Sequence, residues 1–201
     1  MGRTQADRYN RRMDTFYLQD DELSLRGMRA DDAAFVQQCR THPDVVRFQS
    51  WRPATVAEVL ALAGEQQGRA PGMQEEPYQV VIALRDDQGR EHRVGDMGTG
   101  AFDPGRQMEL GIALHPAWQG RGLASRACRL LLGHLFAAGL HRVTARIDPR
   151  NQASLRLFER LGFQYEGLEH QCAWDDDFRE WADEKLFAML AVRWPECDRA
   201  R

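Results

Sequence analysis

The chain has 201 residues, of which 43% are hydrophobic and 28% charged, and these values favour one globular domain with a substantial core. Its 27 basic and 30 acidic residues give a formal net charge of -3, which provides no general attraction to nucleic acids or anionic lipids. No apolar run approaches the roughly 20 residues of a membrane-spanning helix. We therefore expect neither a nucleic-acid partner nor a membrane partner.

The four cysteines are widely spaced and form no C-x-x-C pair; they are Cys39, Cys128, Cys172 and Cys197. This spacing argues against a disulfide framework or a zinc site, so no metal is expected. Reduced thiols are typical of the cytoplasm. The first 14 residues lack the apolar segment of a secretory signal, so a cytoplasmic location is predicted.

The first elements after an N-terminal tail (1–21) are a strand over 23–28 and a helix over 29–40. Either Asp31 or Asp32 is suited to cap this helix. It ends at His42, because the residue before proline avoids the helical region. The residues between this helix and the next are predicted to form a loop.

Thr55 begins the second helix, over 56–67, and Glu58 completes a capping box there. Alternating and β-branched residues then predict strands over 78–86, 91–103 and 107–114, the first two forming a hairpin.

The second half of the chain opens with a helix that reaches about Ala138, with Gly139 at its C-terminus. A strand over 142–148 and a helix over 151–162 follow. A strand over 163–170, an acidic turn over 174–184 and a last strand over 185–192 complete the pattern. The order β-α-α-β-β-β-α-β-α-β-β predicts one α+β domain over 22–194, with a mostly antiparallel mixed sheet flanked by helices and a C-terminal tail over 195–201.

A glycine-rich stretch links the strand over 107–114 to the following helix. It reads Gln119-Gly120-Arg121-Gly122-Leu123-Ala124. No lysine follows the glycines, which excludes a P-loop, and Ser125 stands where a dinucleotide fingerprint needs a third glycine. The pattern Q/R-x-x-G-x-G/A at a helix start instead suits a pyrophosphate, although a plain strand-to-helix turn is an alternative.

With these features, the sequence resembles the RimJ/RimL-like branch of the GNAT N-acetyltransferase superfamily. The resemblance covers about 23–192 and rests on ordered motifs. These are FQSWRP (48–53), MELGIALHPAWQGRGLA (108–124), HRVTARIDPRNQASLRLFERLGF (141–163) and REWADEKLFAML (179–190). It implies a sheet that splays after the fourth predicted strand, and acetyl-CoA as the acetyl donor, with CoA as product.

The resemblance also implies how acetyl-CoA is held. The loop of Gln119, Gly120, Arg121, Gly122, Leu123 and Ala124 would bind the pyrophosphate. Backbone groups of Ile112, Ala113 and Leu114 would pair with the pantetheine. Asn151 would contact the pantetheine side, and it is also a good helix cap.

An amine acceptor must lose a proton before it attacks, since α-amino and lysine amines have pKa values of about 8 and about 10.4. Glu109, on the strand that carries the cofactor, is the favoured general base. His115 has a suitable intrinsic pKa and is a competitor, as is water.

The family's usual proton donor is a tyrosine in the helix after Asn151, and Phe158 stands at that position. Phenylalanine cannot donate a proton, so Ser154 is expected to take over as donor to the departing sulfur and to contact the cofactor. A serine in the first turn that is satisfied locally is the alternative.

The acceptor site is expected to have aromatic walls, with Trp51, Trp174 and Glu109 as candidate substrate-binding residues. Further aromatic candidates are Phe48, Phe178 and Trp181. The acidic residues Asp175, Asp176, Asp177 and Glu180 would either attract a cationic substrate or form a solvated turn.

The predicted function is acetyl transfer from acetyl-CoA to a primary amine, either a protein N-terminus or a small molecule, by direct attack without a cysteine nucleophile. A homodimer is compatible with the resemblance. Because Phe158 replaces the tyrosine, a non-catalytic acyl-CoA-binding or regulatory module is the alternative. A dinucleotide-dependent oxidoreductase is disfavoured by the absent third glycine.

Overall fold

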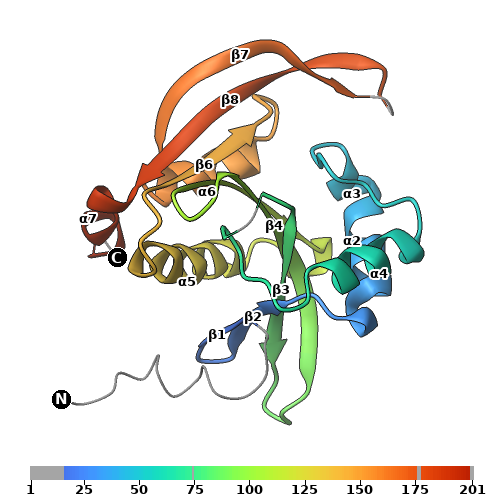
Figure 1. Ribbon diagram of the computed structural model, residues 1–201. Helices are drawn as coiled ribbons and strands as arrows, with labels where there is room; N and C mark the ends of the chain where they lie inside the picture. Colours follow the sequence, from blue (N-terminus) through green and yellow to red (C-terminus); the bar gives the residue numbers. More distant parts are fainter. Residues whose placement is uncertain (1–15, 74, 176–177, 200–201) are drawn as a thin grey trace, which may run out of the picture.

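Eight strands form one mixed sheet in the order β1-β2-β3-β4-β5-β6-β8-β7 (Figure 1). This computed structural model describes residues 16–73, 75–175 and 178–199. The strands are β1 (Tyr17–Asp20), β2 (Leu23–Gly27), β3 (Tyr78–Arg85), β4 (Glu91–Asp103), β5 (Gln107–Leu114), β6 (Arg142–Ile147), β7 (Gln164–Asp175) and β8 (Glu180–Leu190). Every neighbouring pair is antiparallel except β5 and β6, which confirms the mostly antiparallel mixed sheet.

Helices cover both faces of the sheet. They are α2 (Ala33–Thr41), α3 (Pro43–Val46), α4 (Val56–Glu65), α5 (Leu123–Ala137), α6 (Gln152–Arg160) and α7 (Trp194–Arg199), with short 3-10 turns η1 (Ala30–Asp32), η2 (Pro116–Trp118) and η3 (Ala191–Arg193). The larger hydrophobic cluster joins α5 and α6 to the strands, and a smaller one joins α2 and α4 to Val81. Apolar side chains of α2, α4, α5 and α6 therefore attach these helices to the sheet.

Several parts of the described chain differ from the expected elements. Residues 17–20, expected in the N-terminal tail, form β1, which pairs with β2. Residues 43–46, expected in a loop, form α3, with Pro43 in its first turn. Residues 180–184, expected in an acidic turn, are the first part of β8. Part of the expected C-terminal tail belongs to α7.

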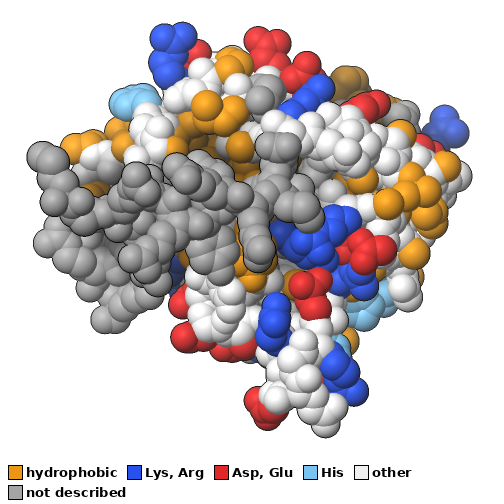
Figure 2. Space-filling model, turned by 60° about the horizontal axis from the view of Figure 1, so that its bottom comes forward, with side chains coloured by type: hydrophobic (Ala, Val, Ile, Leu, Met, Phe, Trp, Pro, Cys, Tyr) orange, Lys and Arg blue, Asp and Glu red, His pale blue; other side chains and the backbone are white. Residues whose placement is uncertain are grey.

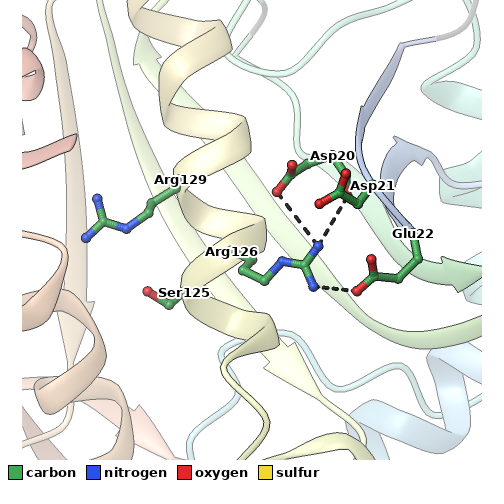
Figure 3. A pocket seen from close by; sticks show the side chains of 6 residues that line it. All are labelled: Asp20, Asp21, Glu22, Ser125, Arg126 and Arg129. Carbon is green, nitrogen blue, oxygen red and sulfur yellow. Dashed lines mark hydrogen bonds and ion pairs between the residues drawn. The ribbon is translucent and has the colours of Figure 1, made fainter. Parts of the chain in front are cut away.

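The early strand β1 is held against α5 by one arginine (Figure 3). Arg126 Nη1 lies 2.6 Å from Glu22 Oε1, and its Nη2 donates to the backbone oxygen of Asp20 over 3.2 Å. Both contacts are exposed, so they contribute modestly to stability. Glu22 lies in the turn between β1 and β2, and Asp20 is the last residue of β1. The polar composition of this segment gave no indication of a strand.

The sheet splays between β5 and β6, as the resemblance implies. In the described part of the chain, their pairing register runs only from Gln107 with Arg142 to Glu109 with Thr144. Beyond Glu109, β5 keeps its register with β4 as far as Leu114, while β6 pairs with β8 as far as Ile147. The two strands therefore separate at Glu109, and the edge of β5 that faces the gap is available for another extended group.

On the face shown in Figure 2, arginines and carboxylates lie beside one another. Surface ion pairs of the described residues include Arg93 with Asp31 and Arg90 with Asp86. Among the residues that the structure describes, no helix combines the length and apolar character that crossing a membrane requires.

Candidate active site

A cavity of about 1460 Å³ opens where β5 and β6 separate. Its walls come from β4, β5 and β6, the start of α6, the β7–β8 ribbon and the loop before α4. Of the predicted site residues, it brings together Trp51, Glu109, Ile112, Asn151, Ser154 and Trp174. Residues that are far apart in the sequence thus meet where β5 and β6 separate.

The other predicted cofactor residues do not line this cavity. Ala113 and Leu114 are buried in the core at the end of β5. The stretch 119–124 continues from η2 into the first turn of α5, and Leu123 anchors it in the core with 5% of its surface exposed. Gln119 Nε2 donates to the backbone oxygen of Leu114 over 2.9 Å, which ties this loop to the end of β5.

The two glycines of the loop have the backbone geometry of an anion cradle. Gly120 and Gly122 have φ angles of 73° and 75°, in the left-handed region that glycine tolerates best. A Cβ built on either one would meet nothing within 4 Å, so packing does not explain their presence. Gly122 is also the N-cap of α5 and offers no side-chain hydrogen bond to the first N–H groups of the helix. These N–H groups suit the pyrophosphate of acetyl-CoA, and the Arg121 guanidinium, 4.9 Å from the Trp118 ring centre, adds positive charge beside them.

Glu109, the predicted base, is engaged in an ion pair. Its Oε2 accepts from Arg146 Nη1 on β6 over 2.5 Å, just where the two strands begin to separate. The same guanidinium donates from Nε to Glu169 of β7 over 3.0 Å. Arg146 therefore bridges three strands across the mouth of the splay, and it was not among the predicted site residues.

A second carboxylate, Glu184 of β8, also lines the cavity. Its side chain is 27% exposed, and its nearest basic atom, Arg146 Nε, lies 4.0 Å away. Burial raises the pKa of Glu184, and the negative charge of Glu109 raises it further. The sequence offered no signal for this residue, because it stood inside a segment expected to be a solvated turn.

Glu169, Cys172 and Glu184 place their ligand atoms within 4.8 Å of one another, which is spacing that a metal ion could use. Arg146 already supplies positive charge here, at 3.0 Å from Glu169 and 4.0 Å from Glu184. A metal cation would have to lie beside this guanidinium, and the like-charge repulsion disfavours it.

The start of α6 presents Ser154 to the cavity. Asn151 caps this helix by accepting from the Ser154 backbone N–H over 3.1 Å, which confirms its predicted capping role. Phe158, one turn later, lines the cavity floor with only 1% of its surface exposed and packs edge-on against Phe163 at 4.9 Å. Phe158, at the position of the family's tyrosine, is thus buried and offers no hydroxyl. Ser154, one turn earlier on the same face of α6, is the nearest hydroxyl of that helix.

His115, the competing base, has a local structural role. It is the N-cap of η2, where its Nδ1 accepts from the Ala117 backbone N–H over 3.3 Å. It does not line the cavity around Glu109.

Aromatic side chains form one wall of the cavity. Phe48, Trp51 and Trp174 line it. The Arg40 guanidinium lies 5.2 Å from the Trp51 ring centre and is itself paired with buried Asp96 at 2.8 Å. Trp51 thus lies beside a buried ion pair and also packs against the smaller hydrophobic cluster of α2 and α4.

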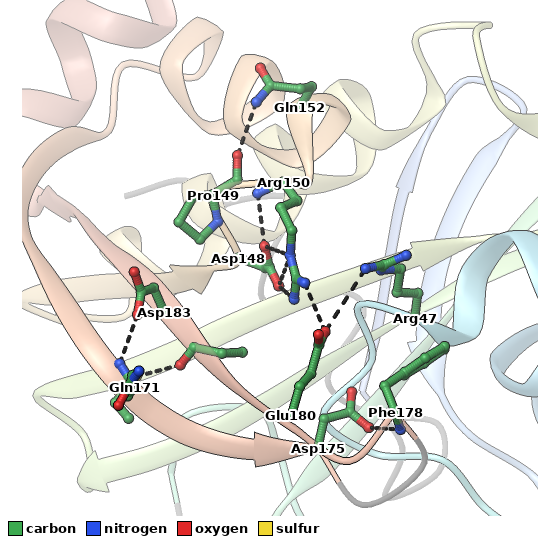
Figure 4. Close-up of polar contacts among 12 residues, drawn as sticks. Arg47, Asp148, Pro149, Arg150, Gln152, Gln171, Asp175, Phe178, Glu180 and Asp183 are labelled. Carbon is green, nitrogen blue, oxygen red and sulfur yellow. Dashed lines mark hydrogen bonds and ion pairs between the residues drawn. The ribbon is translucent and has the colours of Figure 1, made fainter.

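The far end of the β7–β8 ribbon reaches across to the helical side of the molecule (Figures 1 and 4). Arg52 binds Asp175 through two contacts of 2.8 and 2.5 Å, and Arg150 binds Glu180 over 2.7 Å. Asp175 and Glu180, expected as substrate attractors or solvated turn residues, therefore fasten the ribbon beside the cavity. Asp176 and Asp177 lie outside the described residues.

Comparisons with known proteins agree with this geometry. The model of the acetyltransferase (GNAT) domain matches residues 22–164. A spermidine N(1)-acetyltransferase of Escherichia coli is 32% identical over 167 residues, covering 74% of this chain and 77% of its own. An acetyltransferase of the GNAT family from Bacillus anthracis has a TM-score of 0.74 at 22% identity, covering 88% of this chain and 99% of its own. Mycobacterium smegmatis RimJ, solved with CoA-disulfide, has a TM-score of 0.70 at 25% identity, covering 86% of this chain and 84% of its own. The chain belongs to the GNAT family of acetyltransferases.

Proposed function

We propose that this protein transfers the acetyl group of acetyl-CoA to a primary amine, by direct attack while both substrates are bound. The observation that carries the proposal is the splay between β5 and β6, with a glycine cradle at one end and a carboxylate-lined cavity at the other. An extended pantetheine fits the free edge of β5 because it can form strand-like hydrogen bonds there. The thioester would then lie at the mouth of the cavity.

The residues that line the cavity would supply the remaining catalytic and binding groups. The Ser154 hydroxyl would donate to the departing sulfur, and Asn151 would flank the pantetheine. Glu109 and Glu184 are carboxylates able to face the amine, and Trp51 and Trp174 would form the walls that confine it. Cys172 is no nucleophile in this scheme, since burial first and then the negative charge of Glu184 raise its pKa.

Replacing Ser154 by alanine is expected to lower kcat by about tenfold to hundredfold. A hydrogen bond to a charged leaving group contributes about 1.5 to 3 kcal/mol, and each 1.4 kcal/mol is tenfold in rate. Steady-state thiol release and calorimetric titration with acetyl-CoA measure the two effects separately. The matched control is Ser24→Ala, which removes a hydroxyl of β2 outside both the cavity and the 119–124 loop. An equal loss in kcat and in acetyl-CoA affinity would make Ser154 a binding residue only.

Thiol release from acetyl-CoA with a panel of amines tests the function itself. The panel contains polyamines, amino acids, aminoglycosides and peptides with free N-termini, because both polyamine and protein acceptors occur among the relatives' names. We expect amine-dependent release with at least one class. Tight acetyl-CoA binding without release would instead support a non-catalytic acyl-CoA-binding module.

We assign the chain to the RimJ/RimL-like branch on the motifs that it shares with that branch and on its likeness to RimJ. The cytoplasmic location and the homodimer stay predictions. Cell fractionation and light scattering, respectively, test them.

A further inference from the structure

We propose that Glu184, and not Glu109, accepts the proton that the acceptor's ammonium group must lose before attack, while Glu109 is occupied by its contact with Arg146. This inference rests on the proposed function and names the residue that prepares the nucleophile. It predicts an acceptor that arrives as an alkylammonium cation.

Glu109 and Glu184 differ in their hydrogen-bond partners, and this difference assigns them different roles. Glu109 accepts directly from Arg146 Nη1 at 2.5 Å, so a guanidinium already engages one of its oxygens. Glu184 Oε2 lies 4.0 Å from Arg146 Nε. It also accepts a weak hydrogen bond from Cys172 Sγ over 3.7 Å. Of these two cavity carboxylates, Glu184 is the one whose oxygens are not already held by a strong donor.

The charges that face Glu184 come from three neighbouring strands. β5 contributes Glu109, β6 contributes Arg146, and β7 contributes Glu169 and Cys172. Three carboxylates therefore share a single guanidinium, and the excess negative charge favours a cationic acceptor. A bound ammonium group would relieve the repulsion between Glu109 and Glu184.

The proton affinity of Glu184 fits the role. Burial raises its pKa above the ordinary glutamate value, and Glu109 adds to the rise. A general base works best when its pKa approaches the working pH, because it then accepts a proton readily yet remains largely ionised. Arg146 has the opposite effect on the same site, since it lowers the pKa of Glu184 and limits the rise.

Deprotonation of the acceptor by Glu184 comes before acetyl transfer. A proton leaves the ammonium nitrogen for a Glu184 oxygen, and the freed lone pair forms a C–N bond with the thioester carbonyl carbon. The C–S bond breaks, and the second proton lost by the nitrogen passes to the sulfur, assisted by Ser154, to give free CoA. Glu184 releases its proton to water, so that one proton is released for each acetyl group transferred.

The test compares Glu184→Gln with Glu109→Gln in the full chain, each with two kinds of acceptor. One acceptor is an alkylamine, which is mostly charged at neutral pH, and the other is a weakly basic amine that is already neutral there. We expect Glu184→Gln to lower kcat/KM about a hundredfold or more for the alkylamine, with recovery as pH rises, and much less for the neutral amine. Glu159→Gln, on the exposed face of α6, is the control for removing a carboxylate elsewhere.

A second readout does not depend on turnover. Carbon NMR of the glutamate carboxyl groups, with the Glu184 signal assigned from its glutamine variant, is expected to show Glu184 titrating above the ordinary glutamate pKa. An active wild-type enzyme with an undiminished Glu184→Gln variant, or with Glu184 titrating at or below the ordinary glutamate pKa, would overturn this inference alone. A wild-type protein that releases no thiol with any amine would overturn the proposed function and this inference with it.

Discussion

Replacing Gly122 by tryptophan is expected to abolish measurable acetyl-CoA binding while the protein remains folded. The residue has a φ of 75°, and an L-residue there costs about 1 to 2 kcal/mol. A side chain at this position projects into the open space where the pyrophosphate would lie. Losing two charge-assisted hydrogen bonds of about 1.5 to 3 kcal/mol each corresponds to an affinity loss of more than about a hundredfold. Isothermal titration with acetyl-CoA measures this loss.

The matched control is Gly139→Trp at the other end of α5. Gly139 also has a positive φ, of 100°, and a Cβ there likewise meets nothing within 4 Å. This variant carries a similar backbone strain and the same added bulk away from the loop, so its acetyl-CoA affinity should equal that of the wild type. An unchanged acetyl-CoA affinity in Gly122→Trp would show that this loop does not bind the pyrophosphate.

Replacing Asp32 by asparagine is expected to destabilise the fold by about 3 to 5 kcal/mol at neutral pH. The Asp32 side chain is fully buried and pairs with Arg26 at 2.6 Å and with Arg93 at 2.5 Å. Its Oδ2 also accepts from the Arg29 backbone N–H over 2.8 Å. Asparagine keeps the shape but leaves the two guanidinium groups short of a negative partner. Urea unfolding monitored by circular dichroism measures the difference.

The pH dependence of this difference has a definite sign. Burial alone would raise the pKa of Asp32, but the contacts with Arg26 and Arg93 outweigh it, so the folded-state pKa lies below the ordinary value. The stabilisation is therefore fully present above the unfolded pKa of about 3.9 and is lost as pH falls through the folded value. Asp31→Asn is the control, since this exposed neighbour pairs only with Arg93 and should cost less than about 1 kcal/mol. Equal losses in the two variants would contradict the buried-network explanation.

Local patterns predicted most of the fold because local forces determine it. Thr55 caps α4 by accepting from the Glu58 N–H, as the capping box indicates. Gly139 follows α5 with a positive φ, as a helix-terminating glycine should. Asp32 shows the limit of local patterns. It stands at the predicted N-cap position of α2, but its buried carboxylate also pairs with Arg26 of β2 and Arg93 of β4. Its partners lie far along the chain, and no local pattern names them.

In the candidate site, too, residues in local motifs could be predicted, whereas residues that depend on strand pairing could not. Glu109, Asn151 and Ser154 stood in recognisable motifs, and the structure places all three on one cavity. Arg146 and Glu184 were missed, since their role depends on which strands become neighbours. The acidic residues around 175–184 indicate a turn when taken alone, yet pairing with β6 and β7 makes 180–190 a strand and faces Glu184 into the splay.

The most direct test of the central claim follows the acetyl group itself. Acetyl-CoA labelled at the acetyl carbonyl is incubated with the protein and with the amine that gives the fastest thiol release, and the products are separated and analysed by mass spectrometry. We predict that the label is found on the amine nitrogen in a one-to-one ratio with released CoA, with none retained on the protein. Label recovered as free acetate, or attached to Cys172 before the amine is added, would contradict direct transfer within this cavity.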